Sequence, residues 1–188
     1  MKIAITGIGI ISAIGLDQSE TLHSLLAEKS GIGTMQHLHS IHTDLPVGEV
    51  KLSNNELRNR LNINPSEAIS RTSLLGLSAA QEALKQAGIV DVQDMAFISG
   101  TTVGGMDTTE CHWEDWKAGQ NLEYISQHEA GASTLKIAEH LGQFAYTTTP
   151  STACSSALNS IMIGANMLRS KKVSKALVGG TECLSKFH

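Results

Sequence analysis

The chain has 188 residues, of which 41% are hydrophobic, so it is long enough to bury a core and short enough to form one domain. A formal net charge of −4 at pH 7 gives no indication of a nucleic-acid partner. The three cysteines, Cys111, Cys154 and Cys183, show neither the paired spacing of metal ligands nor an even disulfide set, which favours a reducing, cytoplasmic location.

Residues 2–16 combine a positive charge with an apolar run, a pattern that superficially matches a secretory signal peptide. Glycines within this run disfavour the helix of such a segment, and the Ile-rich residues 2–6 instead predict a buried parallel strand. Gly7 and Gly9 suggest a dinucleotide-binding loop, but Ser12 occupies the third glycine position, so we predict no cofactor. No apolar run approaches the roughly 20 residues that cross a bilayer, so we also predict no membrane span.

Hydrophobic periodicity along the rest of the chain predicts helices that alternate with short strands. Helices are expected at about 19–28, 54–61, 66–87, 107–116, 133–140 and from 157 onward, and strands at 95–99, near 147 and at 175–178. Two helices carry apolar stripes, Leu22, Leu25 and Leu26 in the first, and Leu74, Leu77, Ala80, Ala83, Leu84 and Ala87 in the longest. We expect the stripe of the longest helix to pack in the core. Ser133 is expected to cap the helix that follows it. This order of elements argues for a layered α/β sheet of mostly parallel strands.

Two predicted loops carry residue types that are common in binding sites. The first, residues 34–52, contains three histidines: His37, His39 and His42. Adjacent carboxylate or cysteine partners are missing and the segment has loop character, so we assign no metal. In the second loop, Gly104 and Gly105 follow a predicted strand and mark a close approach of the backbone to either substrate or another segment of the chain.

Cys154 is the strongest candidate for a chemically active residue. It follows a β-prone segment interrupted by Pro150 and precedes a helical pattern with apolar residues at Leu158, Ile161, Met162, Ala165 and Leu168. We therefore expect Cys154 at a helix N-terminus, where unpaired N–H groups favour the thiolate, which is the attacking species. Its small neighbours Ala153 and Ser155 allow close approach by a substrate. The alternative is a small buried cysteine with no chemical role.

The sequence around this cysteine resembles that of a known family. Thr152-Ala153-Cys154-Ser155-Ser156, followed by Leu177-Val178-Gly179-Gly180-Thr181-Glu182, is similar to the nucleophile region of the elongating β-ketoacyl-acyl carrier protein synthases. The resemblance implies a thiolase-like α/β fold, with a mixed, mostly parallel sheet and helices on both faces. Residues 1–188 would form its N-terminal domain, the first of two βα halves. It also implies Cys154 as catalytic nucleophile, Ala153 and Ser155 beside the substrate, and Val103 and Met106 as walls of the acyl pocket.

The family reaction needs more groups than this sequence supplies. An acyl group moves from a carrier thioester to the cysteine, and a malonyl carrier then loses carbon dioxide and attacks the acyl-enzyme. Two histidines from the second half of the fold stabilise the enolate in that family, and none of the eight histidines here lies in a matching motif. The resemblance thus implies acyl carrier protein, the second half of the fold and a homodimer mate as partners, in fatty acid or polyketide biosynthesis. We expect the isolated chain to be incompetent for condensation.

Two surface properties follow from this resemblance. Relatives often place basic residues just ahead of the long helix for docking the acidic carrier, where this chain has Glu67 and keeps Arg71, with Arg58 and Arg60 nearby. A half that normally packs against a second half should also expose a large apolar face. We therefore predict that the isolated chain associates.

Several alternatives remain open. A non-catalytic partner subunit like a chain-length factor shares the fold, although such relatives typically lack the cysteine. A truncated remnant would retain the nucleophile region without condensing activity. A cysteine hydrolase would also use a strand–turn–helix nucleophile, but the Gly-x-Cys-x-Gly pattern is absent. Thiolases and the initiating synthases share the fold and are disfavoured by the Thr-Ala-Cys-Ser-Ser sequence.

Overall fold

A three-stranded parallel sheet forms the centre of the structure, a computed structural model that describes residues 2–186. Its strands are β1 (Met95–Gly100), β2 (Tyr146–Thr148) and β3 (Lys175–Gly180), in the spatial order β2-β1-β3. Phe97 of β1 is in register with Thr147 on one side and Leu177 on the other. Every residue of β1 is buried, as expected for a central parallel strand between helical layers. The strands expected near 95–99, 147 and 175–178 are confirmed.

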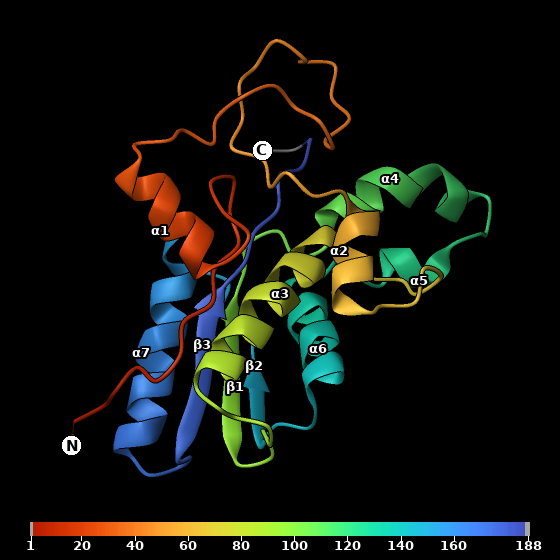
Figure 1. The fold of residues 1–188 in the computed structure, drawn as a ribbon. Helices are drawn as coiled ribbons and strands as arrows, with labels where there is room; N and C mark the ends of the chain where they lie inside the picture. Colours follow the sequence, from red (N-terminus) through yellow and green to blue (C-terminus); the bar gives the residue numbers. More distant parts are fainter. Residues whose placement is uncertain (1, 187–188) are drawn as a thin grey trace.

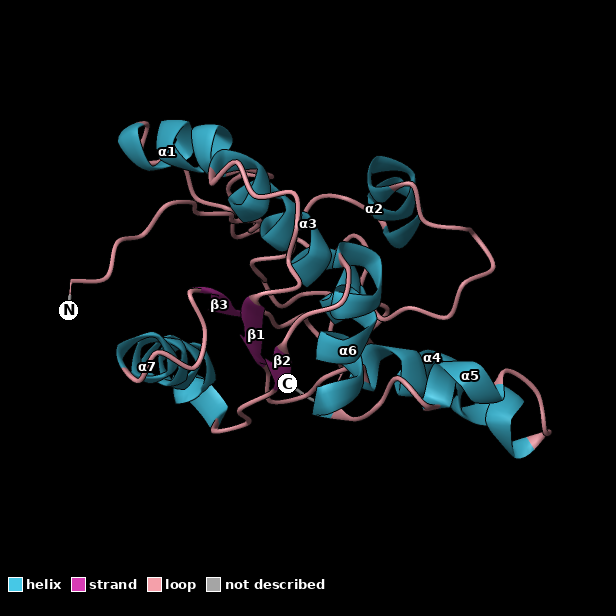
Figure 2. Ribbon diagram, turned by 90° about the horizontal axis from the view of Figure 1, so that it is seen from below, coloured by secondary structure: helices cyan, strands magenta, loops and turns pink. Residues whose placement is uncertain are grey.

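Helices cover both faces of this sheet (Figure 1). They are α1 (Gln18–Leu26), α2 (Asn54–Leu61), α3 (Arg71–Gln86), α4 (Met106–Lys117), α5 (Leu122–Ile125), α6 (Ala130–Leu141) and α7 (Ser156–Arg169), with a short 3-10 turn η1 (Ala153–Ser155). Figure 2 shows α3 and α6 on one face of the sheet and α7 on the other. The connection from β1 to β2 and the connection from β2 to β3 both pass through helices, as parallel strands require. None of the helices between residues 2 and 186 has the length and apolar character needed to span a membrane.

The main core lies between α3, α6 and the sheet. Leu74 and Leu77 of α3 are fully buried, and Ile137 of α6 belongs to the same apolar cluster. Phe97 of β1 stacks on Phe144, with ring centroids 5.1 Å apart, at the edge of this cluster. The apolar stripe predicted on the longest helix is confirmed at its leucines.

The segment 2–6 is not the buried strand that its isoleucines suggest. It pairs with no strand among the described residues, and Ile5 is 83% exposed. The chain that follows lies along α3 instead, where the N–H groups of Ile8 and Ile10 donate to side-chain oxygens of α3 at 2.7 and 2.9 Å. Gly9 approaches α3 so closely that an added Cβ would lie 1.8 Å from the Ala79 carbonyl oxygen. Residues 8–10 are therefore held by α3.

The apolar stripe predicted on the first helix does not face the core. Asp17 caps α1, accepting the N–H of Glu20 at 2.8 Å. However, the leucines face solvent, with Leu22, Leu25 and Leu26 exposed by 58, 61 and 78%. The buried side of α1 carries Thr21 and Ser24, because short polar side chains let the helix lie close to the loop before it; the Ser24 hydroxyl donates to the Ile14 carbonyl at 2.6 Å.

Two other helix starts differ from expectation. Glu129 precedes α6, and Ser133 lies inside that helix, where its hydroxyl donates to the Ala130 carbonyl at 2.8 Å. The longest helix begins at Arg71 because Ser70 acts as its cap, accepting the N–H of Ser73 at 3.1 Å. Ser70 can cap its helix because its own backbone is extended, whereas Ser133 lies within helical backbone.

Glu49 organises the loop that contains the three neighbouring histidines. Its carboxylate is 3% exposed and accepts the N–H groups of Gln36, His37 and Leu38 at 2.7, 3.0 and 2.7 Å. Burial opposes its ionisation, but these hydrogen bonds outweigh burial and hold the pKa of Glu49 below its ordinary value. Within residues 2–186, no group of three or more potential ligands is placed to hold a metal ion.

Candidate active site

Cys154 lies in the turn that joins β2 to α7, at the carboxyl end of the parallel sheet. It is the middle residue of η1, its side chain is exposed, and α7 begins two residues later at Ser156. The predicted position before a helix is thus confirmed. In parallel α/β sheets this edge is where ligands commonly bind, because strand exits and helix N-termini meet there.

The backbone immediately before Cys154 is strained. Ala153 has φ of +51°, in the left-handed region that costs a non-glycine residue roughly 1–2 kcal/mol. The buried hydroxyl of Ser156 holds the turn by accepting the N–H of Thr152 at 2.9 Å and donating to the Ala153 carbonyl at 2.8 Å. The turn therefore exposes the thiol while its own backbone remains anchored.

Small residues bring α7 close to the sheet. Its buried positions are Ser156, Ser160 and Gly164, and an added Cβ on Gly164 would lie 2.5 Å from a methyl carbon of Val178 on β3. Gly100, at the end of β1, gives similar room, since its Cβ would lie 2.6 Å from the Ser156 carbonyl. The nucleophile turn is thus fixed against the ends of the strands.

The apolar stripe predicted on this helix faces away from the sheet. Leu158, Ile161 and Met162 are exposed by 69, 51 and 56%. Hydrophobic spacing identified an apolar face, but the small residues on the opposite face determine which side approaches the strands. α7 therefore carries an uncovered apolar surface, as expected for a half that packs against another.

Gly104 and Gly105 approach another segment of the chain. An added Cβ on Gly105 would lie 2.1 Å from the Gln127 carbonyl oxygen, and one on Gly104 would lie 2.8 Å from the Ala130 backbone. The close approach predicted for these glycines is thus explained by the chain before α6. Val103 precedes them and Met106 begins α4, so both follow the exit of β1. Their role as walls of an acyl pocket stays a prediction.

The other two thiols are held in surroundings that disfavour the thiolate. Cys183 is 7% exposed and accepts a hydrogen bond from the Thr72 hydroxyl at 3.1 Å. Burial, reinforced by the nearby Asp107 carboxylate, raises the pKa of Cys183 to about 12. Burial and the same carboxylate also raise the pKa of Cys111. Both cysteines are therefore poor nucleophiles at neutral pH.

Three histidines make their contacts away from the turn that contains Cys154. His128 bonds the Thr109 hydroxyl at 2.8 Å, and His140 pairs with Glu67 at 2.8 Å. His112 stacks on Tyr124, with ring centroids 4.1 Å apart. These contacts tie the histidines to α4, α5 and the connection that precedes α3 rather than to Cys154.

Two of the three arginines considered for carrier docking are structural. Arg71 is 9% exposed and donates to the Val50 carbonyl and the Asn54 side chain at 2.9 and 2.8 Å. Arg58 is 8% exposed and donates to the Asn64 carbonyl at 3.1 Å. Arg60 is exposed and remains available at the surface.

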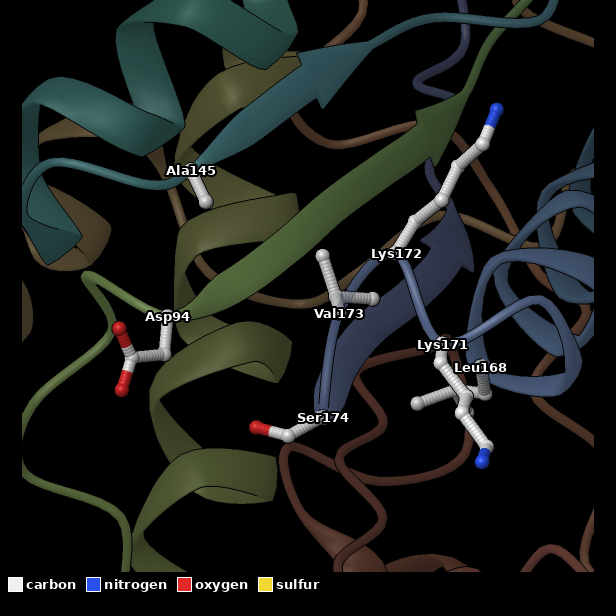
Figure 3. Close-up of a pocket in the computed structure, with 7 residues that line it drawn as sticks. All are labelled: Asp94, Ala145, Leu168, Lys171, Lys172, Val173 and Ser174. Atoms are coloured by element: carbon white, nitrogen blue, oxygen red, sulfur yellow. The ribbon is translucent and has the colours of Figure 1, made fainter.

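A separate hollow of about 460 Å³ lies at the other end of the sheet (Figure 3). Its lining comes from the segments that enter the strands and from the end of α7: Asp94, Ala145, Leu168, Lys171, Lys172, Val173 and Ser174. Figure 3 shows the ammonium groups of Lys171 and Lys172 pointing in different directions. The length of α7 separates this hollow from Cys154, so it is no part of the candidate site.

Comparison with known proteins identifies the family. Residues 1–187 match the family described as β-ketoacyl synthase, N-terminal domain. The chain belongs to the β-ketoacyl synthases. The members of this family are acyl-transferring condensing enzymes, and the Thr-Ala-Cys-Ser-Ser resemblance to them is confirmed.

Individual relatives are similar over nearly all of this chain. Nodulation protein E of Rhizobium meliloti is 26% identical over 192 residues, which cover 96% of this chain and 46% of that protein. The 3-oxoacyl-[acyl-carrier-protein] synthase 2 of Staphylococcus aureus is 25% identical over 194 residues, covering 96% of this chain and 45% of the synthase. This β-ketoacyl synthase chain therefore spans about half the length of these relatives.

The fold agrees with that of solved ketosynthases. The structure described as the ishigamide ketosynthase/chain length factor matches 97% of this chain and 48% of its own, with a TM-score of 0.82 and 24% sequence identity. The likeness confirms the thiolase-like α/β fold of this β-ketoacyl synthase chain, with a parallel sheet between helices.

Proposed function

We propose that this chain forms the N-terminal half of a β-ketoacyl-acyl carrier protein synthase and that Cys154 accepts the acyl group. The supporting observation is the contrast among the three thiols. Cys183 is buried, and Cys111 is exposed in the middle of α4, where desolvation and the Asp107 carboxylate raise its pKa. Of the three thiols, Cys154 alone combines exposure with an anchored, strained turn before a helix.

In the first proposed step, the thiolate of Cys154 attacks the carbonyl carbon of a carrier thioester. A sulfur–carbon bond to Cys154 forms, the bond to the carrier's sulfur breaks, and the carrier thiolate leaves and takes a proton from solvent. N–H groups at the start of α7, including that of Cys154, are the proposed donors to the oxyanion. Ala153 and Ser155 are exposed on either side of the thiol and leave room for the thioester.

In the second proposed step, a malonyl carrier loses carbon dioxide and its carbanion attacks the acyl carbonyl. The bond to Cys154 breaks, which regenerates the thiolate. The enolate requires hydrogen-bond donors, and the contacts of His112, His128 and His140 lie elsewhere. We assign the donors to two histidines of a second half of the fold, so this chain alone would take up an acyl group without condensing it.

The proposed partners follow from the same assignment. Acyl carrier protein delivers both thioesters, with Arg60 as an exposed basic residue near its approach. The second half of the fold covers the apolar face of α7, and a second copy completes a homodimer. Residues 1–188 act as one N-terminal ketosynthase domain in the cytoplasm, in fatty acid or polyketide biosynthesis. Val103 and Met106 line the acyl pocket in this proposal.

Acylation of the purified chain tests the assignment. The chain is incubated with an acyl-carrier thioester, and the site of modification is identified by peptide mass spectrometry. We expect one acyl group on the Cys154 peptide, its loss in Cys154→Ala and its retention in Cys111→Ala. An unmodified chain would instead favour the chain-length-factor-like or remnant alternative. A condensation assay with and without a second-half polypeptide then tests whether the missing donors restore turnover.

A further inference from the structure

A chain of polar side chains joins the segment before Cys154 to the second turn of α7. The side-chain amide of Asn159 donates to the Thr152 hydroxyl oxygen at 2.7 Å and lies 3.4 Å from the hydroxyl of Ser155. The Ser155 hydroxyl in turn donates to the Thr152 carbonyl at 2.8 Å. These bonds bracket the nucleophile, because Thr152 precedes Cys154 and Ser155 follows it.

This arrangement acts on the side of the turn that Ser156 does not reach. Ser156 is 5% exposed and anchors the turn from below, whereas Asn159 is partly exposed and holds Thr152 from the solvent side. Between the two anchors lies Ala153 in its left-handed conformation. A strained residue persists only where its surroundings fix the backbone on both sides, and the two anchors supply that constraint.

We propose that Asn159 is a positioning residue for Cys154. By holding Thr152 through its hydroxyl, Asn159 keeps η1 in line with α7, so that the thiol stays at the N-terminus of the helix. The inference rests on the proposed role of Cys154 as nucleophile. Asn159 does not itself contact the sulfur or the substrate in this proposal; it acts through Thr152 and Ser155.

The direction of the effect follows from the exposure of the thiol. Cys154 is already open to solvent, so a looser turn would add little access for a reagent. It would instead lose the fixed position of the thiol at the N-terminus of α7, where helix N–H groups stabilise negative charge. Removal of the Asn159 amide should therefore slow the reaction of Cys154, although alanine is the better helix former.

The test measures alkylation by iodoacetamide at pH 7 in the 188-residue chain, with the Cys111 peptide of the same molecule as internal reference. We expect Asn159→Ala to lower the Cys154-to-Cys111 rate ratio roughly threefold to tenfold, the range for loss of one hydrogen bond. Asn166→Ala is the matched control, because Asn166 is exposed on the same helix about two turns beyond Asn159 and farther from the nucleophile; its ratio should not change.

Substitutions at Thr152 separate positioning from general destabilisation. Thr152→Ser keeps the accepting hydroxyl and should retain the rate ratio, whereas Thr152→Val should lower it as much as Asn159→Ala. The double variant should be no slower than either single variant, and the thermal midpoints should remain close. An unchanged ratio in Asn159→Ala, or additive losses in the double variant, overturns the positioning role. If Cys154 of the unmodified chain reacts no faster than Cys111, the proposed function itself fails.

Discussion

The hydroxyl of Thr101 donates a hydrogen bond of 2.9 Å to Oε2 of Glu182, across 81 residues of sequence. The other carboxylate oxygen of Glu182 accepts the N–H of Thr102. Thr101 follows β1 and Glu182 follows β3, so the Glu182 side chain connects the carboxyl ends of two neighbouring strands. The Gly-Gly-Thr-Glu sequence at the end of β3 thus fixes the loop that leads to Val103 and Met106.

Glu182→Gln should destabilise the chain. A glutamine side chain has a single acceptor oxygen, so one of the two donors is left without its partner. We expect a loss of about 0.5–1.5 kcal/mol in the free energy of unfolding, measured by urea denaturation. Glu114→Gln is the control, because its ion pair with Lys117 lies at the surface, and its effect should stay within about 0.5 kcal/mol. Equal losses of unfolding free energy in Glu182→Gln and Glu114→Gln would show that the hydrogen bonds of Glu182 do not stabilise the fold.

Asp107→Asn should change how stability depends on pH. Asp107 accepts the N–H of Arg71 at 2.9 Å, and burial raises the pKa of its carboxyl above the ordinary value despite that hydrogen bond. A raised folded-state pKa means that the folded protein holds the proton more strongly, so stability falls as the pH rises from the unfolded pKa through the folded one. Asparagine retains an acceptor for Arg71 and does not ionise.

The measurable quantity is the difference in unfolding free energy between Asp107→Asn and the unmodified chain. The unfolding free energy of the variant should rise relative to that of the unmodified chain as the pH rises from about 4 to 7. The reason is that only the unmodified chain must then hold a buried charge. Urea denaturation at several pH values within this range gives the difference. A constant or falling difference would contradict a raised pKa for Asp107.

Gly164→Ala should destabilise α7 although alanine favours helices. The added Cβ would lie 2.5 Å from a methyl carbon of Val178, so α7 would have to move from the sheet, at a cost of about 1–3 kcal/mol. Gly131→Ala in α6 is the matched control, since no atom lies within 4 Å of its Cβ position, and it should stabilise by up to about 1 kcal/mol. Thermal or urea unfolding should show opposite signs for the two variants. The same sign for both would mean that α7 is not held close to the strands.

The exposed apolar face of α7 should drive association of the isolated chain. Sedimentation velocity is expected to show species larger than the monomer, and the double substitution Leu158→Lys with Ile161→Lys should shift the distribution to the monomer. Leu25→Lys is the control, because Leu25 is 61% exposed on α1. A monomeric unmodified chain, or an equal effect of Leu25→Lys, would show that this face is not responsible.

Sequence patterns predicted those parts of the fold that are buried within this chain. The leucines of α3 are spaced for a helix with one buried face, and β1 is a short apolar run, so both elements could be placed. The leucines of α1 and the apolar stripe of α7 could be recognised as apolar faces, and both face solvent. Periodicity shows that a face is apolar, but it does not show whether the same chain covers that face.

The candidate site was predictable to a similar degree. The small residues around Cys154 and the helical spacing after it indicated a nucleophile before a helix N-terminus, and the structure has that arrangement. The hydrogen bond from Asn159 to Thr152 could not be predicted, because it depends on the left-handed turn at Ala153. A side chain that reaches backward across a turn leaves no periodic signal in the sequence.

The small residues that face the sheet from α7 have a consequence for the order of assembly. Ser156, Ser160 and Gly164 set the height of the helix above the strands through contacts made entirely within this chain. The placement of the thiol does not depend on whatever covers the opposite, apolar side. A docking partner would then supply groups to a nucleophile that is already in position, and loss of that partner would remove turnover while leaving the acyl-accepting geometry intact.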